Sequence, residues 1–342
     1  MVKKLGNWKV WIGLVIAALC LFLAFRKVDF TQMGAAFRQA NYGLLLPALL
    51  MIFLSHWLRT LRWQLLLRPI AAINLSTLFS ALMIGYMTNT FLPAHLGEFV
   101  RAYLVAKKKP VAGSAVFATI VIERIIDVFT LLLLMALTIV VFPFPEWVRK
   151  SGYISFIFIG VLFGILLLMK KYRDRAMVII NALLKPFPHK ISRRIQEMVH
   201  SFLDGVKGLE KKRHYAVVAL LSLAIWFCYA YIFQIGLHAF NFVQLYNLPW
   251  TTSLVLLVIT TIAVLVPSSP GYVGTYHYLC QLTLGLFAVP ESEALTFAFV
   301  VHGINFLPVL IVGFLLASTM GMNLKTIQKQ AKEEEEELEG KN

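Results

Sequence analysis

An apolar helical stretch with charges in its middle is the strongest constraint on this chain. Residues 111 to 142 are mostly apolar and long enough to cross a bilayer, yet they contain Glu123, Arg124 and Asp127. At about 1.5 Å per residue, these side chains lie roughly 20 Å from the lysines at 107 to 109, too deep for short carboxylates to reach the membrane surface. Each such charge costs about 2.5 to 3.5 kcal/mol or more unless it has a partner or faces water.

The spacing of these three residues leaves two interpretations open. Glu123 and Asp127 are four residues apart and share one helix face, with Arg124 beside Asp127. The charges either neutralise one another and only pin helices together, or they line a polar cavity that receives a charged ligand. We favour the cavity because a membrane interior penalises buried ions strongly. On this basis Glu123→Gln, which is nearly isosteric, should reduce activity and leave the amount of folded protein almost unchanged.

Composition places the chain in the membrane. Hydrophobic residues make up 59% of the 342 residues, which predicts an all-α integral membrane protein without a soluble domain. The net charge of +15 lies in loops beside apolar spans, a pattern typical of membrane topology, so we expect no nucleic-acid partner. The three cysteines (Cys20, Cys228 and Cys280) all fall in apolar segments, and we expect no disulfide framework, no metal and no cofactor.

Some of the apolar segments are too short to cross a bilayer alone. The full set of apolar segments is 10–25, 43–58, 75–92, 95–106, 112–142, 153–169, 215–239, 251–267, 272–289 and 293–320. The first has no cleavage site after it, so we expect an uncleaved span. Pro93 separates two short pieces, of which the second reaches only about 18 Å against a core of roughly 30 Å. Such a broken pair predicts a re-entrant hairpin that lines a cavity.

Basic residues predict the orientation. The connector 170–213 holds twelve Lys or Arg against four Asp or Glu, and it should be cytoplasmic. We expect Arg59, Arg62 and Arg68 to lie on the cytoplasmic side, together with this connector. The loop 241–250 has no charge and should face outward. The domain prediction is a polytopic membrane domain, 1–325, and a charged cytoplasmic tail, 326–342, with both termini in the cytoplasm of a cell whose inner (plasma) membrane the chain crosses.

This topology produces an internal repeat. Hairpins at 75–106 and 251–289 would enter from opposite sides, with a first tip at 92–98 and a second tip at 266–272. In each tip a proline is followed by a glycine four residues later. The predicted fold is therefore about six spanning helices plus two re-entrant helical hairpins arranged as an inverted repeat, with the tips meeting near the midplane to form one site.

The first tip is a candidate substrate-binding site. A proline leaves a carbonyl without its usual partner, and a glycine allows the chain to turn, so backbone groups face a ligand. A helix that begins at the tip favours an anion, and Arg101 strengthens that preference, although Glu98 could simply neutralise Arg101 at i, i+3. The candidate residues here are Asn89, Pro93, His95, Gly97, Glu98 and Arg101.

The second tip offers backbone and hydroxyl donors suited to a phosphate or carboxylate. A plain loop at a membrane surface has a similar composition, and a lone intramembrane histidine is often only a hydrogen-bonded core residue. Together with the charged residues of 111–142, the remaining substrate-binding candidates are Pro267, Ser268, Ser269, Pro270, Gly271, Gly274, Thr275, Tyr276, His277, His302 and Asn305.

Three motifs in order carry a resemblance to a known family. They are Asn89-x3-Pro93-x3-Gly97-Glu98-x2-Arg101, then Glu123-Arg124-x2-Asp127, then Pro267-x2-Pro270-Gly271-x2-Gly274. Over nearly its whole length the chain resembles the lysylphosphatidylglycerol synthase transmembrane-domain family. The resemblance implies a flippase domain with re-entrant helices. The chain departs from the bifunctional synthases by ending at Asn342 without their soluble aminoacyl-transferase domain, which leaves the substrate open.

The predicted function is that of a lipid flippase rather than an enzyme. It would move an anionic phospholipid or glycolipid between leaflets through a polar midplane cavity. No G-x-x-x-x-G-K-[ST] motif occurs, so we do not expect ATP to drive it directly. Two alternatives remain open: an integral membrane enzyme acting on a lipid phosphate, and a non-catalytic partner of a separately encoded lipid synthase. The sequence also leaves the oligomeric state open.

Overall fold

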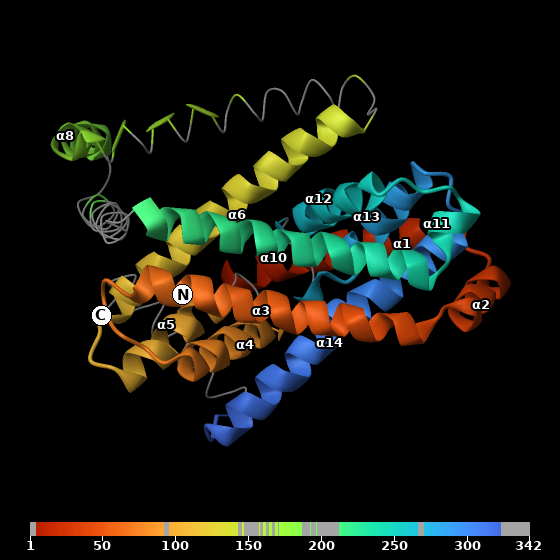
Figure 1. Cartoon of the computed structure of the whole chain (residues 1–342), viewed down its shortest axis with the longest axis horizontal. Helices are drawn as coiled ribbons and strands as arrows, with labels where there is room; N and C mark the ends of the chain where they lie inside the picture. The colour runs from red at the N-terminus through yellow and green to blue at the C-terminus, as the bar shows by residue number, and fades with distance from the viewer. Residues whose placement is uncertain are drawn as a thin grey trace. The chain divides into compact units, whose positions relative to one another are not determined.

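The protein is helical throughout the part that the structure describes. The computed structural model describes residues 5–91, 96–142, 171–186, 212–265 and 270–322, together with isolated positions between 146 and 196. Within these ranges the regular elements are helices and no strand occurs (Figure 1). The predicted all-α class is confirmed.

The helices follow the predicted apolar segments closely. They are α1 (Leu5–Phe25), α2 (Phe30–Gln39), α3 (Leu45–Leu67), α4 (Leu75–Phe91), α5 (Gly97–Lys108), α6 (Gly113–Val141), α8 (Arg173–Leu184), α10 (Lys212–Ala239), α11 (Phe242–Leu245), α12 (Thr251–Leu265), α13 (Thr275–Gly285) and α14 (Glu291–Thr319). The segment 153–169 lies largely outside the described residues. The apolar pattern did not predict α2, α8 or α11. Of these, α2 begins after Asp29 because that side chain accepts hydrogen bonds from the backbone N–H groups of Thr31 and Gln32.

Four helices of the described residues are long and apolar enough to cross a membrane. They lie at Tyr42–Leu67, Gly113–Val141, Arg213–Ala239 and Glu291–Thr319, and two shorter apolar helices lie at Gly13–Phe25 and Thr251–Ile262. A helix needs about 20 apolar residues to span the hydrocarbon core. These helices support a multi-pass membrane protein, while the predicted number of about six spans stays a prediction.

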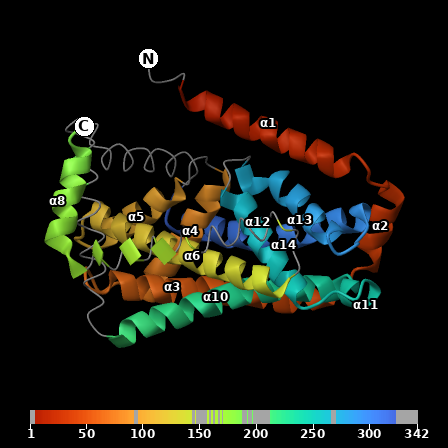
Figure 2. The same ribbon diagram turned by 90° about the horizontal axis from the view of Figure 1, so that it is seen from above.

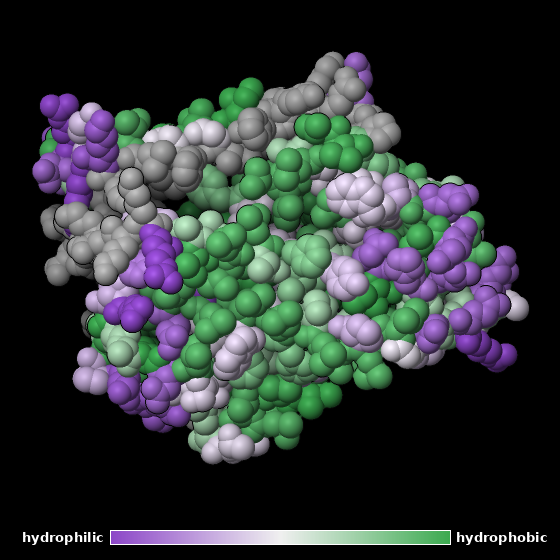
Figure 3. Space-filling model, viewed as in Figure 1, coloured by the Kyte–Doolittle hydropathy of each residue, from purple (hydrophilic) through white to green (hydrophobic). Residues whose placement is uncertain are grey.

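The chain forms two compact units. Unit 1 consists of Met1–Trp57, Met83–Gly97 and Ala224–Leu324, and unit 2 of Leu58–Leu82, Glu98–Leu223 and Lys325–Asn342. In unit 1, α13 packs against α1, α12 and α14, and α2 packs against α14 (Figure 2). Figure 3 shows hydrophilic residues gathered over α2 and α11, whereas the long helices present mostly hydrophobic residues on this face.

The first predicted hairpin is interrupted as expected. Helices α4 and α5 have 17 and 12 residues, or about 25 and 18 Å, each shorter than a core of about 30 Å. Gly97 lies against α4: its N–H donates to Asn89 Oδ1 at 2.7 Å, and a Cβ on Gly97 would overlap the carbonyl oxygen of Gly85. The start of α5 therefore lies beside α4.

The second predicted hairpin is also interrupted. Helices α12 and α13 have 15 and 11 residues. Between them Gly271 and Gly274 have φ of +67° and +99°, values that favour glycine. A Cβ on Gly271 would lie 3.4 Å from Cγ2 of Thr90, so this part of the second tip lies beside the end of α4. The re-entrant path of both hairpins and their inverted symmetry stay predictions.

Candidate functional site

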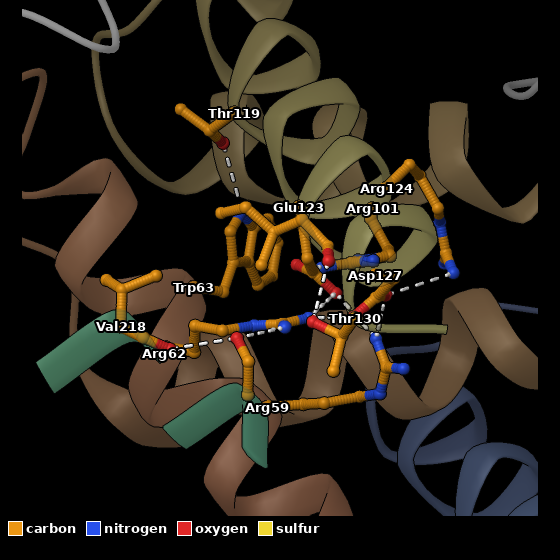
Figure 4. A network of polar contacts seen from close by, with 12 residues as sticks. Arg59, Arg62, Trp63, Arg101, Thr119, Glu123, Arg124, Asp127, Thr130 and Val218 are labelled. Atoms are coloured by element: carbon orange, nitrogen blue, oxygen red, sulfur yellow. Dashed lines mark hydrogen bonds and ion pairs between the residues drawn. The ribbon is translucent and has the colours of Figure 1, made fainter. Parts of the chain in front are cut away.

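Seven charged side chains of unit 2 form one connected set, here called the arginine–carboxylate network. Figure 4 labels all of them except Glu98. They come from three helices: α3, α5 and α6. The members are Arg59, Arg62, Glu98, Arg101, Glu123, Arg124 and Asp127.

Glu123 lies at the centre of this network and is fully buried. Its Oε1 accepts from Nη1 of Arg59 at 3.1 Å, and its Oε2 accepts from Nη2 of Arg101 at 2.9 Å. Nη2 of Arg62 lies 3.7 Å from Oε1. One carboxylate of α6 therefore ties α3 and α5 to its own helix.

Asp127 lies one turn further along α6 and pairs with the same two arginines of α3. Its Oδ2 accepts from Nη1 of Arg59 at 2.8 Å, and its Oδ1 accepts from Nη2 of Arg62 at 2.7 Å. Arg62 also donates from Nη1 to Oγ of Ser222 on α10 at 2.9 Å. Arg124 Nη1 lies 3.8 Å from Asp127 Oδ2, as the i, i+3 spacing predicted.

Besides its ion pair with Glu123, Arg101 also contacts the ring of Trp63. The guanidinium carbon of Arg101 lies 4.2 Å from the centroid of the indole, within range of a cation–π interaction. The indole is itself fixed, because its Nε1 donates to Oγ1 of Thr119 at 3.0 Å. Both Trp63 and Arg101 are almost completely buried.

The network carries more positive than negative charge. Its four arginines face three carboxylates, which leaves one positive charge in excess when all groups are ionised. In addition, Nε and Nη1 of Arg101 and Nε of Arg62 are buried without a hydrogen-bond partner among the described residues. Excess positive charge and spare donors favour an anion near the network.

The outer edge of the network opens into a cavity of about 340 Å³. There Nε of Arg124 lies 2.7 Å from Oε1 of Glu98, and these side chains are 34% and 17% exposed. The rest of the lining is apolar and comes from one face of α6. The lining residues are Glu98, Val121, Arg124, Ile125, Val128, Phe129 and Leu132.

Two expectations from the sequence are wrong. The apolar segment was expected to end at residue 58, before Arg59 and Arg62, but α3 continues to Leu67 and both arginines are buried in it. The suggested pairing of Glu98 with Arg101 is replaced by pairs with Arg124 and Glu123, because α5 packs against α6. The sequence did contain a signal for the role of Arg59 and Arg62. They are spaced i, i+3 and so share one helix face, and the carboxylates Glu123 and Asp127 on another helix needed positively charged partners.

In unit 1 two histidines and three aromatic rings form a second site, here called the histidine cluster. Nε2 of His302 lies 2.9 Å from the carbonyl oxygen of Gly271, and the Gly274 N–H donates to Nδ1 of His277 at 3.2 Å. The two imidazole centroids are 4.7 Å apart. The members are Tyr276, His277, Phe299, His302 and Phe306.

The other candidates of the second tip take more ordinary positions. Asn305 donates to the carbonyl of Val301 on its own helix, and Thr275 donates to the carbonyl of Tyr272. Pro270 begins the short 3-10 helix Pro270–Tyr272. The candidates Pro93, His95, Pro267, Ser268 and Ser269 lie outside the described residues.

The described residues contain no group of three or more His, Cys, Asp or Glu side chains that could hold a metal ion. The single site shared by both tips stays a prediction. What the structure does show is a cluster of ion pairs within unit 2 and a cluster of histidine and aromatic rings within unit 1.

Comparison with known proteins identifies relatives along almost the whole chain. Residues 10–313 match the family model described as the lysylphosphatidylglycerol synthase TM region. The chain is 28% identical over 240 residues to a UPF0104 membrane protein of Methanothermobacter thermautotrophicus, covering 66% of this chain and 70% of that protein. It is 21% identical over 326 residues to a UPF0104 membrane protein of Methanocaldococcus jannaschii, covering 91% and 95%.

A third relative is longer than this chain. The chain is 23% identical over 351 aligned residues to the glycosyltransferase AglD of Haloferax volcanii, covering 94% of this chain but only 56% of that protein. The similarity therefore concerns just over half of AglD. No solved structure matches the chain.

Proposed function

This chain belongs to the family of the lysylphosphatidylglycerol synthase TM region, and on that premise we propose that it moves an anionic lipid between the leaflets of its membrane. The observation that carries the proposal is the cavity of unit 2. A charged pair, Glu98 and Arg124, stands at its edge, and an apolar strip of α6 forms its wall. A lipid has the same two parts, a polar head group and a hydrocarbon chain.

The head group would bind at Arg124. A phosphate oxygen accepts hydrogen bonds from a guanidinium, so the lipid would replace part of the ion pair between Arg124 and Glu98. Arg124 is the most exposed arginine of the ion pairs in the network, and reaching it requires no break in the buried contacts of Glu123.

The hydrocarbon chain would lie along α6. Val121, Ile125, Val128 and Leu132 recur at intervals of four, three and four residues and therefore share one face of the helix. From Val121 to Leu132 this face extends about 16 Å, roughly half of a hydrocarbon core of about 30 Å. Behind it the buried network supplies a net positive charge that attracts the phosphate.

The finer predictions of topology form part of this proposal. We place both termini in the cytoplasm and the chain in the plasma membrane, with two re-entrant hairpins in an inverted repeat. The second tip and the histidine cluster would then contact the moving head group. The position of Gly271, where a Cβ would lie 3.4 Å from Cγ2 of Thr90 near the end of α4, supports an approach of the two tips.

Leaflet-resolved labelling tests the proposal. The full chain is reconstituted into phosphatidylcholine vesicles that contain a trace of fluorescent phosphatidylglycerol, and a membrane-impermeant reductant bleaches only the outer leaflet. We expect the protein to make the inner-leaflet probe accessible and to leave its mass unchanged. Bleaching equal to that of protein-free vesicles would refute the flippase.

Two pairs of variants localise the activity. Arg124→Gln should abolish most movement, while Arg68→Gln, which removes the same charge from an exposed position after α3, should not. Val128→Asp places a carboxylate in the apolar wall and should slow movement, whereas Val140→Asp on the same helix, outside the cavity, should have little effect. If the cavity variant and its control slowed lipid movement equally in either pair, the cavity would not be part of the transport path.

A second candidate is an enzyme that acts on a lipid phosphate, and the similarity to a glycosyltransferase favours it. An acid, a base and several cations lie close together in the network, as such chemistry requires. Mass spectrometry of the lipids after incubation separates the two functions, because an enzyme changes the covalent structure of the lipid and a flippase changes only its leaflet.

A further inference from the structure

The hydrogen bonds of the histidine cluster determine one nitrogen of each ring in this structure. The carbonyl of Gly271 can only accept, so Nε2 of His302 carries the proton in that contact. The Gly274 N–H can only donate, so Nδ1 of His277 offers a lone pair. His277 is therefore the neutral tautomer with its proton on Nε2, an atom buried without a partner among the described residues.

The bond from Gly274 to His277 closes the start of α13. Gly274 precedes the helix and His277 is its third residue, the position from which a side chain commonly satisfies the first free N–H. The backbone of Gly274 is held at φ +99°, and a Cβ there would lie 2.6 Å from the carbonyl oxygen of Ala17 on α1. The beginning of α13 thus depends on one nitrogen lone pair.

We propose that His277 is a proton-binding site and that binding a proton releases the start of α13 from its closed form. The proton comes from water and forms an N–H bond at Nδ1. Two donors then face each other, so the Gly274 N–H loses its acceptor. The inference rests on the proposed transport function for its purpose, since the proton would be the coupling ion, but its test does not depend on lipid movement.

Among the described residues that contact His277 there is no counter-ion that would stabilise a charged ring in place. The titratable groups beside it are His302 on α14 and Tyr276 on α13, with Cys280 three residues further along α13. On α1 the titratable residue nearest in sequence to Ala17, which lies beside Gly274, is Cys20, and the sequence of α12 has none. The carboxylates at the start of α14 are engaged elsewhere, Glu291 with Lys27 and Glu293 with Tyr246.

His277 is 1% exposed. A charged imidazole in such a place costs free energy unless it gains a partner or water. Proton binding is therefore coupled to opening, and the structure shows the unprotonated, closed form.

Hydrogen–deuterium exchange measures whether the Gly274 N–H is hydrogen-bonded to His277. The full chain in nanodiscs of phosphatidylcholine and phosphatidylglycerol is exchanged between about pH 5 and about pH 8, the range in which an imidazole titrates, with times scaled to the intrinsic rate at each pH. We expect protection at 271–279 to fall by up to about tenfold per pH unit toward acid, the limit for one proton bound on opening.

Two variants locate the proton. His277→Gln keeps an acceptor for the Gly274 N–H but cannot titrate, so its protection should stay constant with pH. His302→Gln keeps the donor to Gly271 and should still respond to pH. A peptide from α11, which lacks histidine, controls for general unfolding.

Equal protection at every pH in the native protein would overturn the inference, as would an acid response that His277→Gln retains or that His302→Gln alone abolishes. A pH response in a protein that moves no lipid would leave the proton site standing and refute the flippase. Lipid movement by a protein whose exchange does not respond to pH would support the flippase and refute the proton site.

Discussion

The arginine–carboxylate network of unit 2 and the histidine cluster of unit 1 stabilise buried polar groups in opposite ways. In the network nearly every polar contact joins one side chain to another, as in the contacts of Glu123 with Arg59 and Arg101. In the cluster the polar contacts go to the backbone, from His302 to Gly271 and from Gly274 to His277.

This difference determines what each region tolerates. Removing one charge from the network leaves its partners buried and unpaired, which is far more costly than the pair itself is stabilising. The cluster contains no ion pair among the described residues, so it should depend on backbone geometry and on single hydrogen bonds. Variants of Glu123, Gly274 and His302 test this contrast, and Tyr246 provides a case outside both regions.

Glu123→Gln should destabilise the protein by about 3–5 kcal/mol, because Arg59 and Arg101 lose a buried counter-charge. The structure thereby changes the expectation from sequence that this variant would reduce transport without loss of folded protein. Thermal unfolding in detergent and the yield of monodisperse protein measure the effect. The double variant Glu123→Gln with Arg101→Met should recover part of the loss, since it removes both charges. Unchanged stability in the single variant would show that the network does not act as a set of buried pairs.

Gly274→Ala should be the most damaging small change in the histidine cluster. The new Cβ would lie 2.6 Å from a backbone oxygen of α1 at a φ that alanine rarely adopts, at a cost of about 1–3 kcal/mol. Gly34→Ala in α2 is the matched control, because a Cβ there meets nothing within 4 Å and alanine favours a helix by up to about 1 kcal/mol. The same unfolding midpoint for both variants would contradict the dependence on backbone geometry.

His302 distinguishes a hydrogen bond from mere packing. His302→Leu leaves the carbonyl of Gly271 without its donor and should cost about 1–3 kcal/mol, whereas His302→Gln can restore the donor and should cost less than about 1 kcal/mol. Chemical denaturation of the two variants side by side gives the difference. If leucine is tolerated as well as glutamine, the cluster is held by its rings alone.

The smallest effect is expected at Tyr246, which lies outside the spanning helices. Partial burial, and then the hydrogen bond to Glu293, raise the pKa of Tyr246 to about 12. A raised pKa in the folded state means that this contribution is complete below about pH 10, the ordinary tyrosine value, and is lost as the pH rises toward 12. Tyr246→Phe should cost about 0.5–1.5 kcal/mol at neutral pH and should lack that alkaline loss. Parallel alkaline unfolding curves for the two proteins would rule out the contact.

The sequence predicted the elements of the fold better than the contacts between them. Proline, glycine and short apolar runs were sufficient to locate the break between α4 and α5 and the break between α12 and α13. The charges of α6 stood out because polar residues are rare in apolar stretches. In contrast α2 is short, and only the capping residue Asp29 indicates where it begins.

The partners within the network could not be predicted. The spacing of Glu98 and Arg101 favours a pair on one helix, but which carboxylate an arginine meets depends on how α5 packs against α6. Arg59 and Arg62 were missed because basic residues near the end of an apolar run resemble loop charges. Because α3 continues to Leu67, both arginines belong to the helix and not to the loop after it.

The network also has a consequence for how the chain is made. Arg59 and Arg62 lie in α3, and the first carboxylate that neutralises them, Glu123, follows 64 residues after Arg59. At about 5–20 residues per second, ribosomes need roughly 3–13 s to synthesise that interval. During this time α3 carries two arginines that each cost about 2.5–3.5 kcal/mol in a bilayer centre. We therefore expect nascent chains that stop before α6 to keep α3 at the insertion machinery, and α3 to enter the lipid only when its counter-charges arrive.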